Sequence, residues 1–189
     1  RYALELSDEE REAVYEKLYN EPGFGIWMGN LRDTFVNEEA NATISEFIKK
    51  KIRSRVDDPA IAEKLCPTDH GFGTRRVPLE SNYYEVYNQD NVELVDVKEL
   101  PIERVTANGV KTSDAEYEFD IIVYATGFDA VRGAFDHIDF EGVNGQTLKA
   151  KWEDGPRTYL GMTIEGFPNL FTVVGPHNAA TFCNIPRCI

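Results

Sequence analysis

The sequence is poor in the residues that hold metal ions and disulfide bonds. Its 189 residues include three cysteines and three histidines. Cys66, Cys183 and Cys188 form no CxxC pair, and the histidines do not cluster. No metal site is therefore expected, and because so few thiols are typical of a reducing compartment, we predict a cytoplasmic protein.

Basic residues and long apolar runs are also scarce. The chain has 20 Lys and Arg against 33 Asp and Glu, which gives a net charge of -13. Binding to nucleic acid or to an anionic membrane needs an excess of positive charge, so neither is expected as a partner. No apolar run approaches the length of a membrane span, and no signal peptide opens the chain. The negative net charge does not exclude an anionic cofactor, because one or two suitably placed arginines can bind a phosphate.

The chain also lacks a Gly-x-Gly-x-x-Gly loop, the sequence that cradles the pyrophosphate of a dinucleotide. It begins at Arg1 rather than Met and stops at Cys188-Ile189. We therefore expect a fragment of a larger enzyme.

Residues 1 to 66 carry patterns that are typical of helices. Ser7-Asp8-Glu9-Glu10 fits a capping box and predicts the start of a helix. The segment from Glu21 to Gly25 should end that helix. A second helix is expected from about Asn37 to Arg55, and a third from Asp58-Pro59 through Leu65. The basic run from Lys49 to Arg55 fits a solvated helix face better than a phosphate site.

Two apolar runs, Asp120 to Asp129 and Asn169 to Pro176, end in small residues. A continuous apolar run predicts a strand that is buried on both faces, as in a parallel sheet. In an open α/β sheet, ligands bind in the crevice beyond the carboxyl ends of such strands. The two runs predict an α/β fold, although an ordinary core strand that ends in a glycine turn would show the same pattern.

Shorter strands and turns lie around these runs. Asn108-Gly109 between two short β-branched runs predicts a hairpin, followed by a short strand from Tyr117 to Phe119. Asn144-Gly145 predicts a second hairpin. Asn91 to Val97 is expected to form a strand, and Lys151-Trp152 a polar turn or short helix.

Several further segments lie in the order in which one flavoprotein family carries them. They are Phe72-Gly73-Thr74-Arg75-Arg76, Asn82-Tyr83-Tyr84-Glu85-Val86-Tyr87-Asn88, Asp90-Asn91-Val92-Glu93-Leu94-Val95, Ala125-Thr126-Gly127-Phe128-Asp129-Ala130, Arg157-Thr158-Tyr159-Leu160-Gly161 and Gly166-Phe167-Pro168-Asn169-Leu170-Phe171, with Gly175-Pro176 after the last. In these segments the chain resembles the Baeyer–Villiger monooxygenases of the cyclohexanone and phenylacetone type, which are class B flavoprotein monooxygenases. Each segment alone is a weak match, but together they are specific.

The resemblance implies FAD and NADPH as cofactors. It also implies that O2 and a small-molecule ketone react through a peroxyflavin to give an ester or lactone. The implied fold has two Rossmann-like dinucleotide-binding domains, one for FAD and one for NADPH, with an N-terminal helical insertion. Residues 1–70 would form the helical insertion of the NADPH domain, residues 71–126 the C-terminal part of that domain, and residues 127–189 part of the FAD domain. The remainder of the parent chain would complete both domains.

The resemblance also implies roles for single residues. Arg76 matches the catalytic arginine, whose permanent charge can stabilise an anion on the flavin and contact the nicotinamide. Arg75 matches a basic position that contacts the 2′-phosphate of NADPH. An exposed arginine pair held by neighbouring carboxylates is the alternative interpretation. The cofactor-binding positions are Arg75, Arg76, Ala125, Thr126, Gly127, Asn184 and Ile185, of which Ile185 departs from a frequent Met.

Tyr159 and Leu160 match positions near the substrate pocket, although an aromatic residue in this context is more often part of a core.

Three other functions stay open. The parent could be an N- or S-oxidising flavin monooxygenase, or an FAD or NADPH reductase that transfers no oxygen. The chain could also be a non-catalytic acidic module that binds a partner through the helix from Asn37 to Arg55, which requires the apolar stripe of that helix to be exposed. Because the phosphate-binding loops are absent, we predict that the 189-residue chain alone is inactive.

Overall fold

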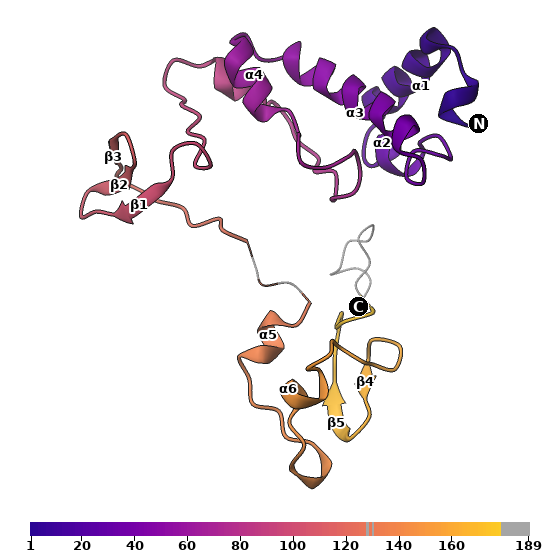
Figure 1. Cartoon of the computed structure of the whole chain (residues 1–189), viewed down its shortest axis with the longest axis vertical. Helices are drawn as coiled ribbons and strands as arrows, with labels where there is room; N and C mark the ends of the chain where they lie inside the picture. Colours follow the sequence, from indigo (N-terminus) through magenta and orange to yellow (C-terminus); the bar gives the residue numbers. More distant parts are fainter. Residues whose placement is uncertain (128, 130, 179–189) are drawn as a thin grey trace. The chain divides into compact units, whose positions relative to one another are not determined.

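The computed structural model describes residues 1–127, 129 and 131–178. The chain divides into two compact units, Arg1–Ile121 and Ile122–Ile189 (Figure 1). Both helices and strands occur in the described ranges, and every strand pair there is antiparallel. No helix in these ranges is long and apolar enough to cross a membrane.

Three helices of the first unit begin at the caps that the sequence predicts. Helix α1 (Asp8–Asn20) follows Ser7, which forms a complete capping box with Glu10. Helix α3 (Glu38–Arg53) follows Asn37, whose Oδ1 accepts a hydrogen bond from the backbone N–H of Ala40. Helix α4 (Pro59–Leu65) follows an Asp58 cap and places its proline in the first turn, where no N–H is needed. The three predicted helices are confirmed.

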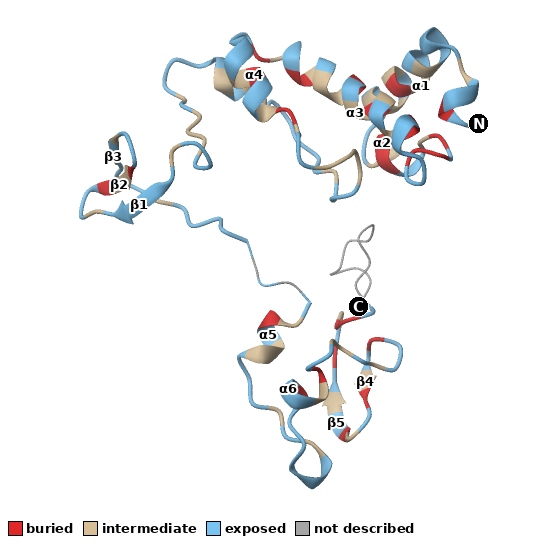
Figure 2. Ribbon diagram, in the orientation of Figure 1, coloured by how far each residue is buried: buried red, intermediate tan, exposed pale blue. Residues whose placement is uncertain are grey.

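Helices α1 and α3 bury their apolar faces against each other (Figure 2). Tyr15 packs on Phe47 with ring centroids 5.6 Å apart, and its hydroxyl lies 2.7 Å from Thr43 Oγ1. The short helices η1 (Ala3–Glu5) and α2 (Gly25–Met28) also contribute to this core. The buried members of the core are Ala3, Tyr15, Ile26, Leu31, Ala40, Ile44 and Phe47. The apolar stripe of α3 is therefore covered, and the partner-binding module loses the exposed face that it requires.

A small antiparallel sheet occupies the end of the first unit. Strands β1 (Ile102–Val105), β2 (Gly109–Thr112) and β3 (Glu116–Glu118) follow one another in the order β1-β2-β3. A Cβ at Gly109 would lie 1.8 Å from the carbonyl oxygen of Tyr117, so only glycine fits at this position in β2. The predicted hairpin and the strand after it are confirmed.

The second unit has its own core around Trp152. Helices α5 (Gly133–Asp136) and α6 (Leu148–Lys151) and strands β4 (Thr163–Ile164) and β5 (Phe167–Phe171) surround it. Its buried residues are Leu148, Trp152, Ile164 and Phe167. Helix α6 confirms the short helix predicted at this position.

The predicted hairpin at Asn144-Gly145 is only partly formed. Both residues have positive φ, 61° and 73°, within the short helix η3 (Val143–Gly145), so the predicted turn is present. The flanking residues form one isolated bridge, between Glu141 and Thr147, and no strand.

The prediction of a buried strand from Asp120 to Asp129 is wrong. Residues 121–127 form no strand, and the side chains of Ile121 and Val123 are both 80% exposed. Strands are stable when neighbouring strands pair with their backbone groups and cover their side chains. No strand in the described ranges pairs with this segment, so its apolar character alone does not bury it.

The lack of neighbouring strands also accounts for two further differences between the predicted and the observed strands. Residues 91–97 form turns and irregular structure instead of a strand. Near the predicted strand from Asn169 to Pro176, β5 begins earlier, at Phe167, and ends at Phe171. It pairs only with the two-residue β4, so most of its residues are exposed. The position of this strand is approximately right, but its predicted burial is wrong.

Candidate functional site: the arginine loop

Residues 71–76, here called the arginine loop, are attached to helix α3 by two side chains one turn apart. Asn41 donates from Nδ2 to the carbonyl oxygens of Thr34 and Phe72, both at 2.9 Å. Ser45 Oγ accepts from the backbone N–H of Phe72 at 3.0 Å and donates to Asn41 Oδ1 at 3.0 Å. Both backbone polar groups of Phe72 are thus held by α3.

Two glycines allow the loop to approach the helical core closely. A Cβ at Gly71 would lie 2.4 Å from Asn41 Oδ1. Gly73 has φ +74°, and a Cβ there would lie 2.4 Å from Phe35 Cε1 and 3.0 Å from Trp27 Nε1. Between them, the Phe72 side chain packs on the core of α1 and α3. Glycine is required at both positions, for space at Gly71 and also for backbone conformation at Gly73.

The two arginines of the loop have different surroundings. The Arg76 guanidinium lies 5.5 Å from the centre of the Phe24 ring, and no carboxylate in the described ranges pairs with it. Arg75 Nη2 lies 3.2 Å from Asp69 Oδ2, with 66% of the Arg75 side chain exposed. The hydrogen bond to His70, followed by the charge of Arg75, lowers the pKa of Asp69. Such an exposed ion pair is weak. The alternative interpretation, an exposed arginine held by a neighbouring carboxylate, therefore applies to Arg75 but not to Arg76.

A groove of about 950 Å³ runs beside the arginine loop. Its walls come from α3, the end of α1 and the segment from residue 67 to residue 84, and both arginines line it. The volume lies in the range of small-molecule sites. Two other cations in its wall already have acidic partners, because Lys51 pairs with Glu16 and Arg55 with two glutamates. Lys51, Arg53 and Arg55 of the basic run are thus used in ion pairs.

Arg55 joins α3 to the opposite wall of the groove. Its guanidinium donates to Glu85 at 2.6 and 2.7 Å and to Glu80 at 2.7 and 3.2 Å. It also donates to Tyr19 Oη at 3.0 Å and lies 4.9 Å from the centre of the Tyr84 ring. These hydrogen bonds lower the pKa values of both glutamates. A single side chain therefore holds α1, α3 and the start of η2 (Glu85–Asn88) together.

A tyrosine cluster extends this wall. The rings of Tyr84 and Tyr87 both lie against Tyr83, at 5.3 and 5.6 Å between centroids. Burial, together with the hydrogen bond to Tyr83, raises the pKa of Tyr87 to about 12. This hydroxyl therefore stays protonated at neutral pH and is a poor candidate for acid–base chemistry.

The other predicted cofactor residues belong to the second unit. Ala125, Thr126 and Gly127 are exposed and lie in no helix or strand. Gly127 has φ +86°, and a Cβ there would meet nothing within 4 Å, so this glycine serves the backbone conformation. Asn184 and Ile185 lie outside the described residues.

A turn in the second unit carries Tyr159 and Leu160. Thr158 Oγ1 accepts from the N–H of Gly161 at 3.0 Å and lies 2.9 Å from His177 Nδ1. Leu160 has φ +53° and is 69% exposed. These two side chains are therefore not part of a core, and their place near a substrate stays a prediction.

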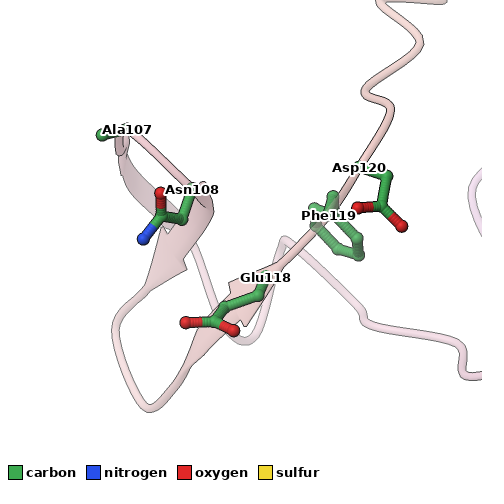
Figure 3. A pocket seen from close by; sticks show the side chains of 5 residues that line it. All are labelled: Ala107, Asn108, Glu118, Phe119 and Asp120. Carbon is green, nitrogen blue, oxygen red and sulfur yellow. The ribbon is translucent and has the colours of Figure 1, made fainter.

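A smaller hollow of about 490 Å³ lies at the antiparallel sheet of the first unit (Figure 3). It is lined by Ala107, Asn108, Glu118, Phe119 and Asp120. Its two carboxylates make it unsuitable for a phosphate. No group of His, Cys, Asp and Glu in the described part of the chain could hold a metal ion.

Comparison with known proteins gives relatives that are all named monooxygenases, a phenazine N-monooxygenase of Lysobacter antibioticus at 43% identity among them, although no family model matches the chain. The chain is 54% identical over 188 residues to the 2-oxo-Δ(3)-4,5,5-trimethylcyclopentenylacetyl-CoA monooxygenase of Pseudomonas putida, covering 100% of the chain and 34% of the relative. It is 48% identical over 186 residues to the cyclopentanone 1,2-monooxygenase of Comamonas sp. (strain NCIMB 9872), covering 97% and 34%. The crystal structure of OTEMO in complex with FAD and NADP matches with a TM-score of 0.93 and 54% identity, covering 100% and 35%. The chain is homologous to Baeyer–Villiger monooxygenases.

The chain spans about a third of the length of these monooxygenases. Within that third, the match to OTEMO confirms the predicted flavoprotein fold class. Sequence reasoning found the arginine loop but missed Asn41 and Ser45, which hold it. Their i, i+4 spacing on a predicted helix was visible, but their contact with a loop 27 to 31 residues away was not.

Proposed function

We propose that the chain belongs to an FAD- and NADPH-dependent Baeyer–Villiger monooxygenase that uses O2 to convert a ketone into an ester or lactone. The observation that carries the proposal is the arginine loop, placed beside a groove in a chain that is 54% identical to a monooxygenase. The cofactors, the ketone and O2 would meet in the complete protein. The sparse cysteines support a cytoplasmic location.

The residues of the arginine loop fit an anionic cofactor. Arg75 and Arg76 both line the groove, and their guanidinium groups are donors that suit phosphate. Arg75 would exchange its exposed contact with Asp69 for the 2′-phosphate of NADPH. Arg76 lies over Phe24 and has no carboxylate partner among the described residues, so its N–H donors would be available to the reacting groups of substrate and cofactor.

When bound, FAD would supply the oxygen-transfer chemistry and NADPH the electrons. Arg76 would contribute a fixed positive charge beside the oxygen atoms that become negative during the reaction. Ala125, Thr126, Gly127, Asn184 and Ile185 are proposed to contact FAD or the junction between the cofactor domains. The first three have small side chains, so their backbone can approach a ligand closely.

Replacing Arg76 in the complete enzyme tests its catalytic role. Arg76→Ala should lower the rate of ester or lactone formation by roughly 100-fold or more, because one preorganised charge is lost at the reacting atoms. The midpoint of thermal unfolding should change little, since Arg76 is exposed. The measurement is chromatographic quantification of the ester together with NADPH consumption. Arg104→Ala, at an exposed arginine on β1, is the control and should retain wild-type activity.

Unchanged ketone oxidation by Arg76→Ala would contradict this role. A panel of ketones, thioethers and amines separates the remaining functions. Ester or lactone products support the proposal, whereas sulfoxides or N-oxides alone would support the N- or S-oxidising alternative. NADPH oxidation without any oxygenated product would support the reductase.

A further inference from the structure

The backbone of Phe72 is held at both of its polar groups by a pair of side chains on α3. We propose that Asn41 and Ser45, here called the α3 clamp, are positioning residues that place Arg75 and Arg76 for cofactor binding. This inference rests on the proposed function of the two arginines. Both side chains contact the backbone of Phe72, and they are proposed to act on the two arginines through the loop.

The clamp determines where the loop begins its turn. Directly after Phe72 the chain closes a tight turn, in which the N–H and the hydroxyl of Thr74 both donate to the carbonyl oxygen of Gly71, at 3.3 and 2.9 Å. Gly71 lies against Asn41 of α3, and Gly73 lies against Phe35 and against Trp27 of α2. The backbone of Phe72 is held by the clamp, and the glycines on either side of it pack against neighbouring side chains. Together these contacts determine the direction in which the chain continues to Arg75.

Beyond Thr74 the loop has few other constraints. The backbone groups of residues 75–79, all within the described ranges, make no hydrogen bond. Arg75 has one exposed ion pair and Arg76 one ring contact. The clamp is therefore the main source of order for the two arginines.

The members of the clamp also hold each other. Ser45 donates to Asn41 Oδ1, which leaves Asn41 Nδ2 directed at Thr34 and Phe72. Loss of either side chain should release part of the loop. Asn41→Ala removes the hydrogen bonds to Thr34 and Phe72 and should release the loop more than Ser45→Ala does. Ser45→Thr retains the hydroxyl and should behave like the wild type.

The experiment uses the complete enzyme with FAD bound. The first measurement is the rate of trypsin cleavage after Arg75 and Arg76, followed by mass spectrometry, because cleavage reports local opening of the loop. Asn41→Ala should accelerate this cleavage about 10-fold, and Ser45→Ala less. The matched controls are Asn20→Ala and Ser54→Ala, which remove side chains of the same types from helix ends that do not touch the loop.

The second measurement is the dissociation constant of NADP⁺ relative to that of NAD⁺, by titration calorimetry. Asn41→Ala should reduce the preference for NADP⁺ about 10-fold, which corresponds to about 1.4 kcal/mol. A merely structural role of the clamp would lower the unfolding temperature without changing this ratio. An unchanged ratio, or cleavage no faster than in the controls, would contradict the positioning role of the α3 clamp.

Arg75→Ala separates failure of the clamp from failure of the proposed function. If Arg75→Ala lowers the NADP⁺ preference while Asn41→Ala and Ser45→Ala do not, the clamp is wrong and the role of Arg75 stands. If Arg75→Ala leaves the preference unchanged, both the role of Arg75 and the clamp are wrong. Should Asn41→Ala fail to fold, Ser45→Ala and its conservative partner Ser45→Thr decide the question.

Discussion

Gly73 shows how strongly one residue can determine the form of the arginine loop. Its φ of +74° lies in the left-handed region, where a side chain is strained. The space that a side chain would occupy is also filled by Phe35 and Trp27. Gly23 has a nearly identical φ of +79°, but a Cβ there would meet nothing within 4 Å. The two glycines therefore separate the cost of backbone strain from the cost of crowding.

Substitution of these glycines by alanine should reveal the two costs. Gly23→Ala should lower the free energy of unfolding by about 1 kcal/mol, from backbone strain alone. Gly73→Ala should lower it by about 2–4 kcal/mol, because the Phe35 ring, 2.4 Å from the added Cβ, and the neighbouring Trp27 indole must also give way. Urea denaturation followed by circular dichroism measures both changes. Equal losses in the two variants would show that the loop is not packed against α2.

Helix α3 is the element that organises the first unit. Its apolar face forms the core, its Asn41 and Ser45 hold the arginine loop, and Arg55 just beyond its end holds the opposite wall of the groove. The Arg55 guanidinium serves two carboxylates at once, with only 20% of its side chain exposed. Lysine carries the same charge but cannot form this planar, bidentate contact.

Replacing Arg55 by lysine should make the stability of the first unit less dependent on pH. Hydrogen bonds from Arg55 lower the pKa values of Glu80 and Glu85 below their ordinary value of 4.5 in the folded state. Carboxyl groups with a lowered folded-state pKa stabilise the fold above their unfolded pKa. This contribution is lost as the pH falls through the folded-state pKa. Arg55→Lys should therefore lower the unfolding temperature at pH 7, with a difference that narrows below pH 4.5.

Arg53→Lys is the matched control for that prediction. Arg53, the last residue of α3, pairs with Glu46 on that helix and with Glu63 on α4, but all three side chains are more than a third exposed. The effect on the unfolding temperature should be smaller than for Arg55→Lys, because exposed pairs contribute little. A difference between Arg55→Lys and the wild type that is independent of pH would contradict the role assigned to the ion pairs.

At the scale of the whole molecule, each unit has a core of its own within the described ranges, and an exposed apolar segment lies at the boundary between the two units in the sequence. The arginine loop belongs to the first unit, and Ala125 to Gly127 belong to the second. Residues 121–127 find no pairing strand in the described ranges. The predicted domain boundaries at residues 70 and 126 stay predictions.

The 189-residue chain alone should not retain FAD. The sequence has no Gly-x-Gly-x-x-Gly loop to hold the pyrophosphate, and Ala125 to Gly127 are exposed to solvent. An absorbance spectrum of the purified chain after incubation with FAD and desalting should show no flavin band at roughly 450 nm. A stoichiometric band would contradict this expectation, and the complete enzyme treated in the same way is the positive control.

The local structure of the helices was determined by the sequence itself. Capping by Ser7, Asn37 and Asp58 depends on groups within a few residues of each other, so the starts of α1, α3 and α4 could be predicted. The Asn108-Gly109 hairpin is local in the same way. The arginine loop was visible because its glycines and arginines are contiguous.

Burial and long-range contacts were decided only by the tertiary structure. The apolar run after Asp120 has the composition of a buried strand, yet residues 121–127 are largely exposed, because burial depends on neighbouring elements. The contacts of Asn41 and Ser45 with Phe72, and of Arg55 with Glu80 and Glu85, join segments 25 to 31 residues apart. Composition and spacing show which groups are able to pair, but only the folded chain brings particular donors and acceptors within hydrogen-bonding distance.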